Sequence, residues 1–172
     1  MIQLKEIFQS LHQHEVKYLL CGGIAVNLYG IPRMTADIDV LIEWKEDNLK
    51  KFEEAIAEHG YKHNLFFELK TLLQEELRLK YVKEKNLIAY GYSSNTLQAL
   101  TLDVLIDVPV NFEECWNRKE IKYFKETPVN VLHVDDLIVL KGYANREQDQ
   151  SDIANLKRFY KKWLLQKKKT NI

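Results

Sequence analysis

The sequence predicts an α+β domain in which strand-forming and helix-forming segments alternate and the end of the chain is helical. Two observations indicate this class. Between residues 4 and 56 the apolar residues change from helical spacing to the two-residue alternation of strands and back again. Beyond residue 133 only helical spacing follows. Because 172 residues with 46% hydrophobic content suit one core, we expect a single domain over 1–172, with an α/β core over 1–133 and C-terminal helices over 134–172 packed on it.

The segments before Gly60 have clear patterns. The expected order is a helix over 4–11, a strand over 16–21, a short helix over 24–29, a strand over 37–42 and a helix around 49–56. Gly22-Gly23 stop the first strand, and Gly30 and Gly60 end helices. The 37–42 segment alternates acids with aliphatic residues, which is typical of a half-buried strand.

The later segments are less regular, and we assign no chemistry between residues 61 and 100. The expected order is a helix over 71–80, a strand over 86–92, a strand over 101–108, a hairpin of 120–124 and 129–132 around a Thr127-Pro128 turn, and two C-terminal helices. Asp135 or Asp136 is expected to cap the first of these helices, which runs to about Arg146. Ser151 or Asp152 is expected to cap the second.

Charge is balanced overall but not along the chain. The 25 Lys and Arg cancel the 25 Asp and Glu, which excludes a protein that is basic all over. No acid follows Asp152, and the last 20 residues contain seven Lys or Arg. A segment such as Lys161 to Lys169, with Trp163 inside it, is more often a solvated helix end than a surface for RNA or an acidic partner.

The cysteines and histidines indicate no metal or redox site. Cys21 and Cys115 are too few for a disulfide scaffold. His59 and His63 straddle Gly60, which breaks the helical spacing that a zinc pair needs. The sequence has no signal-peptide pattern and no apolar run of membrane-spanning length. We therefore expect a cytoplasmic protein with no membrane partner.

Two acidic patterns lie on predicted strands. Asp37 and Asp39 are two residues apart, so the pleat directs both carboxylates to one face of the sheet. Asp103 lies in a similar pattern on what we expect to be a neighbouring strand. Three carboxylates on one face repel each other unless a cation lies among them, and such hard oxygen ligands suit Mg²⁺ or Mn²⁺. An isolated Asp-x-Asp, however, is usually only a solvated strand face.

The glycines before this strand strengthen the functional interpretation. Gly22 and Gly23 end a strand and open a helix, where backbone N–H groups form an anion site. This predicts a phosphate site close to the acidic strand. The chain has neither the glycine-rich loop of P-loop enzymes nor the dinucleotide-binding fingerprint.

These residues together resemble the polymerase-β-type nucleotidyltransferase superfamily. The resemblance lies in Gly22-Gly23, in Asp37-Ile38-Asp39-Val40 after thirteen intervening residues, and in Leu102-Asp103-Val104. The surroundings of these motifs, and the stretch from Asp135 to Ile153, are similar to small bacterial and archaeal members, including the nucleotidyltransferase-like toxins of abortive-infection and toxin–antitoxin systems. The resemblance implies a polymerase-β-like fold, in which helices pack on a mixed sheet.

The resemblance also implies an activity, namely transfer of a nucleoside monophosphate from an NTP to an acceptor hydroxyl, with pyrophosphate leaving. Gly22 and Gly23 would hold the triphosphate, and Asp37 and Asp39 would bind two Mg²⁺ or Mn²⁺ ions. Asp103 would complete one metal site and help to deprotonate the acceptor. The acceptor is left open between a small molecule such as an antibiotic, a tRNA end, a protein and another nucleotide.

Further residues are weaker candidates for nucleotide binding. Arg33 and Thr35 precede the acidic pair, where they either contact phosphate or orient the turn. Lys141 and Arg146 lie on the first C-terminal helix and either reach the triphosphate or pair with nearby acids such as Asp149.

Two alternatives to catalysis remain at this stage. One is a nucleotide-binding regulator, or an antitoxin-like partner of another protein, on the same fold. The other is a structural interaction protein whose acids merely solvate a sheet face.

Overall fold

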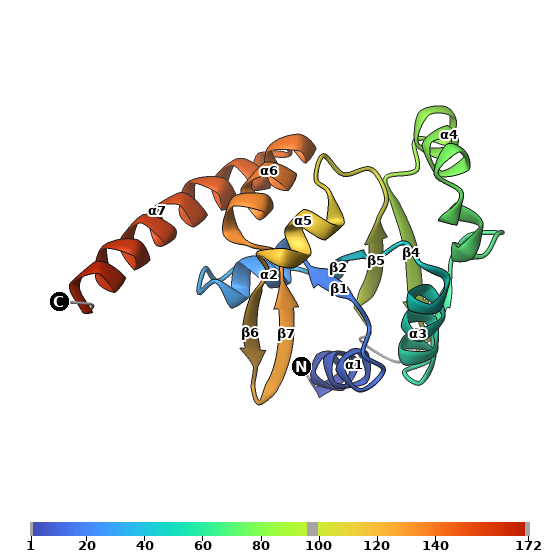
Figure 1. Ribbon diagram of the computed structural model, residues 1–172, viewed down its shortest axis with the longest axis horizontal. Helices are drawn as coiled ribbons and strands as arrows, with labels where there is room; N and C mark the ends of the chain where they lie inside the picture. The colour runs from blue at the N-terminus through green and yellow to red at the C-terminus, as the bar shows by residue number, and fades with distance from the viewer. Residues whose placement is uncertain (1, 96–99, 171–172) are drawn as a thin grey trace.

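The protein is built on one mixed sheet with helices packed around it (Figure 1). The computed structural model describes residues 2–95 and 100–170, and side-chain surroundings for 4–95 and 100–161. Its seven strands lie in the order β3-β4-β5-β2-β1-β7-β6. The pairs β2 with β5 and β1 with β7 are parallel, and the other neighbours are antiparallel. The predicted mixed α+β fold is therefore confirmed.

The strands and helices alternate through most of the chain. The strands are β1 (Tyr18–Leu20), β2 (Asp37–Ile42), β3 (Tyr61–His63), β4 (Ala89–Ser94), β5 (Thr101–Leu105), β6 (Glu120–Phe124) and β7 (Thr127–Val131). The helices are α1 (Ile2–Gln13), α2 (Gly22–Leu28), α3 (Glu46–Ala57), the 3-10 helix η1 (Leu69–Leu73), α4 (Glu75–Lys85), α5 (Phe112–Asn117), α6 (Val134–Ala144) and α7 (Glu147–Thr170). Within the part of the chain that the structure describes, no helix is both long and apolar enough to cross a membrane.

The hairpin turn differs from the prediction. Residues 125 and 126 form the turn, with Lys125 at a positive φ of 56°, while Thr127 and Pro128 lie inside β7. Proline is tolerated in this strand because the neighbouring β1 pairs with β7 only at Val131, so the missing N–H of Pro128 breaks no ladder bond with β1. The Thr127-Pro128 turn is thus wrong, although the hairpin itself is confirmed.

The helix starts near the C-terminus also differ from the prediction. His133 caps α6, since its ring nitrogen accepts the Asp135 backbone N–H at 3.3 Å. Asp136 is instead buried in an ion pair with Arg118. The last helix, α7, begins at Glu147, before both residues that were predicted to cap it, Ser151 and Asp152, and α5 was not predicted at all. The side chains of Trp163 and of the lysines beyond it lie outside the described residues.

The core under β2 positions the functional face of the sheet. Ile38 and Val40 on β2 and Leu102 and Val104 on β5 are fully buried. Because neighbouring residues of a strand point to opposite faces, these side chains direct the intervening acids to the other face. The same alternation that buries the apolar residues therefore places the half-buried aspartates together on the opposite face.

A buried hydrogen bond ties the N-terminal half of the chain to the start of the C-terminal helices. The Tyr29 hydroxyl, at the end of α2, donates to the carbonyl of Leu132 at 2.9 Å, and both residues are buried. Leu132 immediately precedes the cap of α6. This bond therefore links the helix that follows Gly22-Gly23 to the chain that enters α6.

Substitution of Tyr29 by Phe is expected to lower the free energy of unfolding by about 1–2 kcal/mol, because it leaves the buried Leu132 carbonyl without its donor. Urea denaturation followed by circular dichroism would measure this. Tyr123→Phe is the matched control, because Tyr123 is 66% exposed and its loss should change stability by no more than about 0.5 kcal/mol. Equal stabilities for the two variants would contradict the role assigned to the bond.

Candidate active site

Two of the predicted aspartates are direct neighbours across the sheet. Asp39 on β2 and Asp103 on β5 are register partners in the parallel pair, so their side chains leave the same face side by side. Asp37 lies two residues earlier on β2, opposite Thr101, whose hydroxyl donates to the Asp37 carboxylate. The structure therefore brings together the three carboxylates that the sequence indicated.

The three carboxylates nevertheless point apart. An Asp39 carboxylate oxygen lies only 1.8 Å from the position that a Cβ on Gly22 would occupy, so Asp39 lies directly over that glycine. Asp103 Oδ1 is close to Gly91 on β4, and Asp37 is turned to Thr101. Among the described residues, no three acidic, histidine or cysteine side chains are gathered closely enough to enclose a metal ion. Mutual repulsion of like charges favours such a divergent arrangement.

The pKa values of Asp39 and Asp103 are both raised. Burial, followed by the negative charges of Asp103 and Asp37, raises the pKa of Asp39 to about 6. Burial and the charge of Asp37 also raise the pKa of Asp103. The positive charges of Arg146 and Lys141 act on Asp39 in the opposite direction but do not cancel these effects. This face of the sheet therefore holds more negative charge than its neighbours neutralise.

The two glycines allow close backbone approach at the start of α2. Gly22 has a φ of +64°, and a Cβ there would collide with the Asp39 carboxylate. A Cβ on Gly23 would lie 2.6 Å from Thr35 Oγ1 and 3.1 Å from Arg33 Nε. Two of the predicted nucleotide-binding residues are thus packed against the second glycine. No residue with a side chain fits at either position without movement of its neighbours.

Arg33 and Lys141 are partners of buried acids. Arg33 Nη1 lies 2.6 Å from Asp152 Oδ2, and Lys141 Nζ lies 2.6 Å from the same oxygen and 3.1 Å from Asp149 Oδ1. The side chains of Lys141, Asp149 and Asp152 are each at most 4% exposed. Of the two roles considered for Lys141, this structure therefore shows the second, in which it pairs with acids of the following helix.

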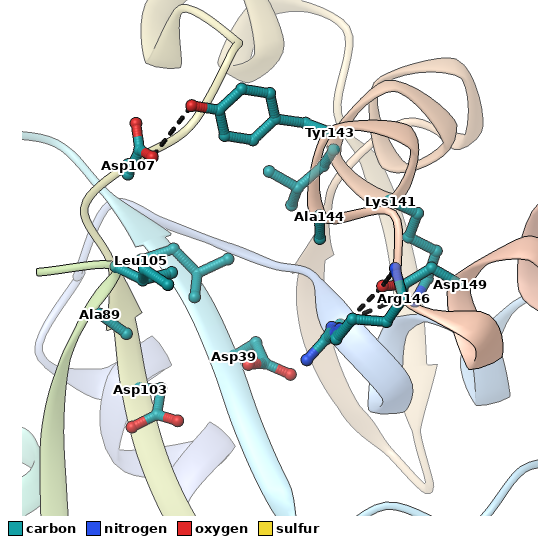
Figure 2. A pocket seen from close by; sticks show the side chains of 13 residues that line it. Asp39, Ala89, Asp103, Leu105, Asp107, Lys141, Tyr143, Ala144, Arg146 and Asp149 are labelled. Atoms are coloured by element: carbon teal, nitrogen blue, oxygen red, sulfur yellow. Dashed lines mark hydrogen bonds and ion pairs between the residues drawn. The ribbon is translucent and has the colours of Figure 1, made fainter. Parts of the chain in front are cut away.

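Arg146 occupies a different environment. Its guanidinium pairs with Asp149 at 2.8 Å, yet its side chain is 73% exposed. Figure 2 shows that it extends across the site toward Asp39. Burial would raise the pKa of Asp149, but hydrogen bonds from Arg146 and Lys141 outweigh burial and lower it. Asp149 therefore stays ionised and holds Arg146 in place beside the acidic strands.

A pocket of about 530 Å³ joins these groups. One end is polar and is lined by Gly22, Asp39, Asp103, Lys141, Arg146 and Asp149. The other end was missed by sequence reasoning, and Figure 2 shows Leu105, Asp107, Tyr143 and Ala144 there. Ile88, Ala89 and Leu140 complete the lining of the pocket. Little in the sequence indicated that Asp107 and Tyr143 belong to the site. Asp107 lies two residues beyond β5 and Tyr143 two residues beyond Lys141, so their only signal was a position close to the predicted motifs. Arg33, Thr35 and Asp37 do not line the pocket.

Solved structures with the same fold are distant in sequence. A lincosamide antibiotic adenylyltransferase, LnuA, crystallised with lincomycin, has 19% identity and a TM-score of 0.60 over 92% of this chain and 97% of its own. A putative nucleotidyltransferase from Thermotoga maritima has 15% identity and a TM-score of 0.52 over 95% and 91% of the two chains. The solution structure of the antibiotic-resistance factor ANT(2'')-Ia has 9% identity and a TM-score of 0.54 over 99% and 95%.

The family is established by the sequence itself. A comparison with curated proteins found no significant match. The sequence model that describes the Aminoglycoside-2''-adenylyltransferase family matches residues 3–156, which includes the strands, both glycines and the start of α7. None of these comparisons indicates the toxin–antitoxin subgroup. The superfamily predicted from the glycines and aspartates is confirmed, and the chain belongs to the Aminoglycoside-2''-adenylyltransferase family of nucleotidyltransferases.

Proposed function

We propose that the protein is a metal-dependent adenylyltransferase that moves AMP from ATP to a hydroxyl of an aminoglycoside antibiotic and releases pyrophosphate. The observation that carries this proposal is the position of Asp39 and Asp103, which are register partners on neighbouring strands and line one pocket beside Gly22. The family match supports the adenylyl donor and the aminoglycoside acceptor.

The acidic face fits divalent metal ions. Its donors are carboxylate oxygens, which Mg²⁺ and Mn²⁺ prefer. Burial first, and then the negative charges of Asp103 and Asp37, raise the pKa of Asp39, and a bound cation would neutralise that charge. Asp37 and Asp39 would hold the ions together with Asp103. Ions bound there would neutralise charge on the transferred phosphoryl group and on the leaving oxygen.

The residues of the chain itself would position the donor. The backbone N–H groups of Gly22 and Gly23 would contact the triphosphate, because their missing side chains let phosphate oxygens approach the backbone. Arg146 is the exposed cation that faces Asp39, so it is the group best placed to pair with the leaving pyrophosphate. Lys141 is bound to two acids, and we expect it to act mainly by holding α6 and α7 in place.

Asp103 would act on the acceptor. A general base works best when its pKa lies nearer the working pH than that of a free carboxylate, and the pKa of Asp103 is raised. Asp103 would accept the proton of the acceptor hydroxyl as that oxygen bonds to the α-phosphorus and pyrophosphate leaves. Little other protein chemistry is needed, because positioning and electrostatic stabilisation lower most of the barrier of phosphoryl transfer.

The proposed reaction can be tested with ATP labelled at the α-phosphate, Mg²⁺, and either tobramycin or lincomycin as acceptor. We expect labelled tobramycin, no labelled lincomycin, and a loss of at least about a hundredfold in kcat for Asp103→Asn. Asp47→Asn is the control, because Asp47 is exposed at the start of α3. Binding of ATP without product on either antibiotic would favour the alternative of a nucleotide-binding regulator.

The raised pKa of Asp39 predicts that the ionised carboxylate lowers the stability of the folded protein. Because this pKa is about 6 in the folded protein against 3.8 for a free aspartate, the folded protein holds the proton more tightly than the unfolded chain does. Ionisation therefore lowers stability as the pH rises from about 4 to about 6, and the full loss persists above pH 6. In EDTA at pH 8, Asp39→Asn should raise the free energy of unfolding by about 1–3 kcal/mol.

This gain should shrink toward zero at pH 4, where the native Asp39 is protonated. Urea titrations at the two pH values would measure it, with Asp47→Asn again as the control. A variant that is less stable than the native protein at pH 8 would contradict the electrostatic interpretation of this site.

The glycines give a matched pair of substitutions. Gly22→Ala places a Cβ 1.8 Å from Asp39 Oδ2 at a residue with a positive φ, so it should displace Asp39 and reduce kcat/KM at least about a hundredfold. Gly142→Ala lies within α6, where a Cβ meets no atom within 4 Å, and it should stabilise the helix by up to about 1 kcal/mol. Retained activity in Gly22→Ala would refute the assigned role.

A further inference from the structure

The pocket continues beyond the groups that the proposed reaction uses. Its second end lies between the end of β5 and the last turns of α6, and aliphatic side chains form most of its wall. Two large hydrophobic side chains of the pocket lining are exposed to solvent, because Ile88 is 56% exposed and Tyr143 is 55% exposed. Leu105 and Leu140 lie deeper in the same wall. A flat apolar group placed here would remove this surface from water.

One polar group stands at this apolar end. The Tyr143 hydroxyl donates to Asp107 Oδ2 at 2.9 Å, which joins α6 to the segment after β5 (Figure 2). Asp107 Oδ1 accepts no hydrogen bond from any residue that the structure describes. An ionised carboxylate can only accept hydrogen bonds, so Oδ1 offers an acceptor to a ligand. Tyr143 holds the carboxylate in one orientation while its ring lines the pocket.

The separation from the acidic strands suits one part of the donor. Asp107 is four residues beyond Asp103, which limits the distance between their Cα atoms to about 14 Å. A nucleotide whose α-phosphate lies at Asp39 and Asp103 would extend over such a span through its ribose to the edge of its base. The base is also the flat apolar part of that molecule and carries hydrogen-bonding groups on its edge.

We propose that this end of the pocket binds the nucleobase of the donor and that Asp107 selects a purine with an amino group on C6, adenine in preference to guanine. The base stacks on Tyr143 between the aliphatic walls, and its exocyclic amino group donates to Asp107 Oδ1. Guanine has a carbonyl at the corresponding position, which would place two acceptors against each other. This inference rests on the proposed function, because it places the phosphate of the same donor at Asp39 and Asp103.

A competing occupant is the acceptor antibiotic, whose ammonium group would also suit a carboxylate. The apolar lining favours the base, because this end of the pocket has a single carboxylate amid aliphatic and aromatic surface. A polyamine would leave most of this surface uncovered.

Isothermal titration calorimetry of the protein with Mg²⁺ and ATP or GTP, without any antibiotic, separates the two occupants. We expect the native protein to bind ATP more tightly than GTP. Asp107→Asn should weaken ATP roughly tenfold and bind GTP no worse, because the amide can donate to the guanine carbonyl. Tyr143→Ala should weaken both nucleotides roughly tenfold through lost stacking. Tyr123→Ala is the control, since it removes an exposed tyrosine from β6, at the far edge of the sheet.

Each other outcome overturns the inference in a recognisable way. If ATP binds the Asp107 and Tyr143 variants as it binds the native protein, while KM for tobramycin rises, the site belongs to the acceptor and the proposed function stands. If the native protein binds ATP and GTP equally, no base is selected here. If it binds neither nucleotide with Mg²⁺, the proposed function fails together with the base site. Circular dichroism of each variant would show that loss of binding does not come from loss of folding.

Discussion

The parallel pairing of β2 with β5 sets two carboxylates side by side, and the pocket of the active site is built around this pair. Register alone makes Asp39 and Asp103 neighbours, and burial prevents water from screening them fully. The side chains diverge, and burial together with the charges of Asp103 and Asp37 raises the pKa of Asp39 to about 6. An arrangement that costs stability in this way is typical of a binding site, because the ligand supplies the missing charge.

The C-terminal helices supply part of the balancing charge through a buried network. Arg33 and Lys141 share Asp152, and Lys141 and Arg146 share Asp149. Three cations against two acids leave one positive charge in excess, and Arg146 is the exposed member of the network, which Figure 2 shows extending toward Asp39. Because Arg33 lies between α2 and β2 while Asp152 lies on α7, the network also fastens the last helix to the segment that precedes the acidic strand. Breaking one member would leave its buried partner uncompensated.

The sequence predicted the parts of this site that depend on local pattern. The strand bounds of β2 and the direction of its aspartates follow from the alternation of Asp with Ile and Val, and the glycines mark the turn into α2. The identity of the partner strand came from the likeness of two acidic patterns. Contacts between distant segments were beyond reach, since Arg33 and Asp152 are 119 residues apart and nothing local signals that they pair. The cap of α6 was missed because a histidine ring nitrogen replaces the usual acidic cap.

The two ends of the pocket come from different parts of the chain, and this explains why the active site needs the C-terminal helices. The strands supply carboxylates but only part of an apolar wall, whereas α6 supplies Leu140, Tyr143 and Ala144 opposite them. Of the residues whose burial the structure describes, the last in the buried core is Leu156, where the family match also ends. Six of the seven basic residues in the last 20 lie beyond residue 157, after the end of the family match. Among the described residues, the positive charge that faces the acidic pair at the active site comes from Arg146 and from the buried network behind it.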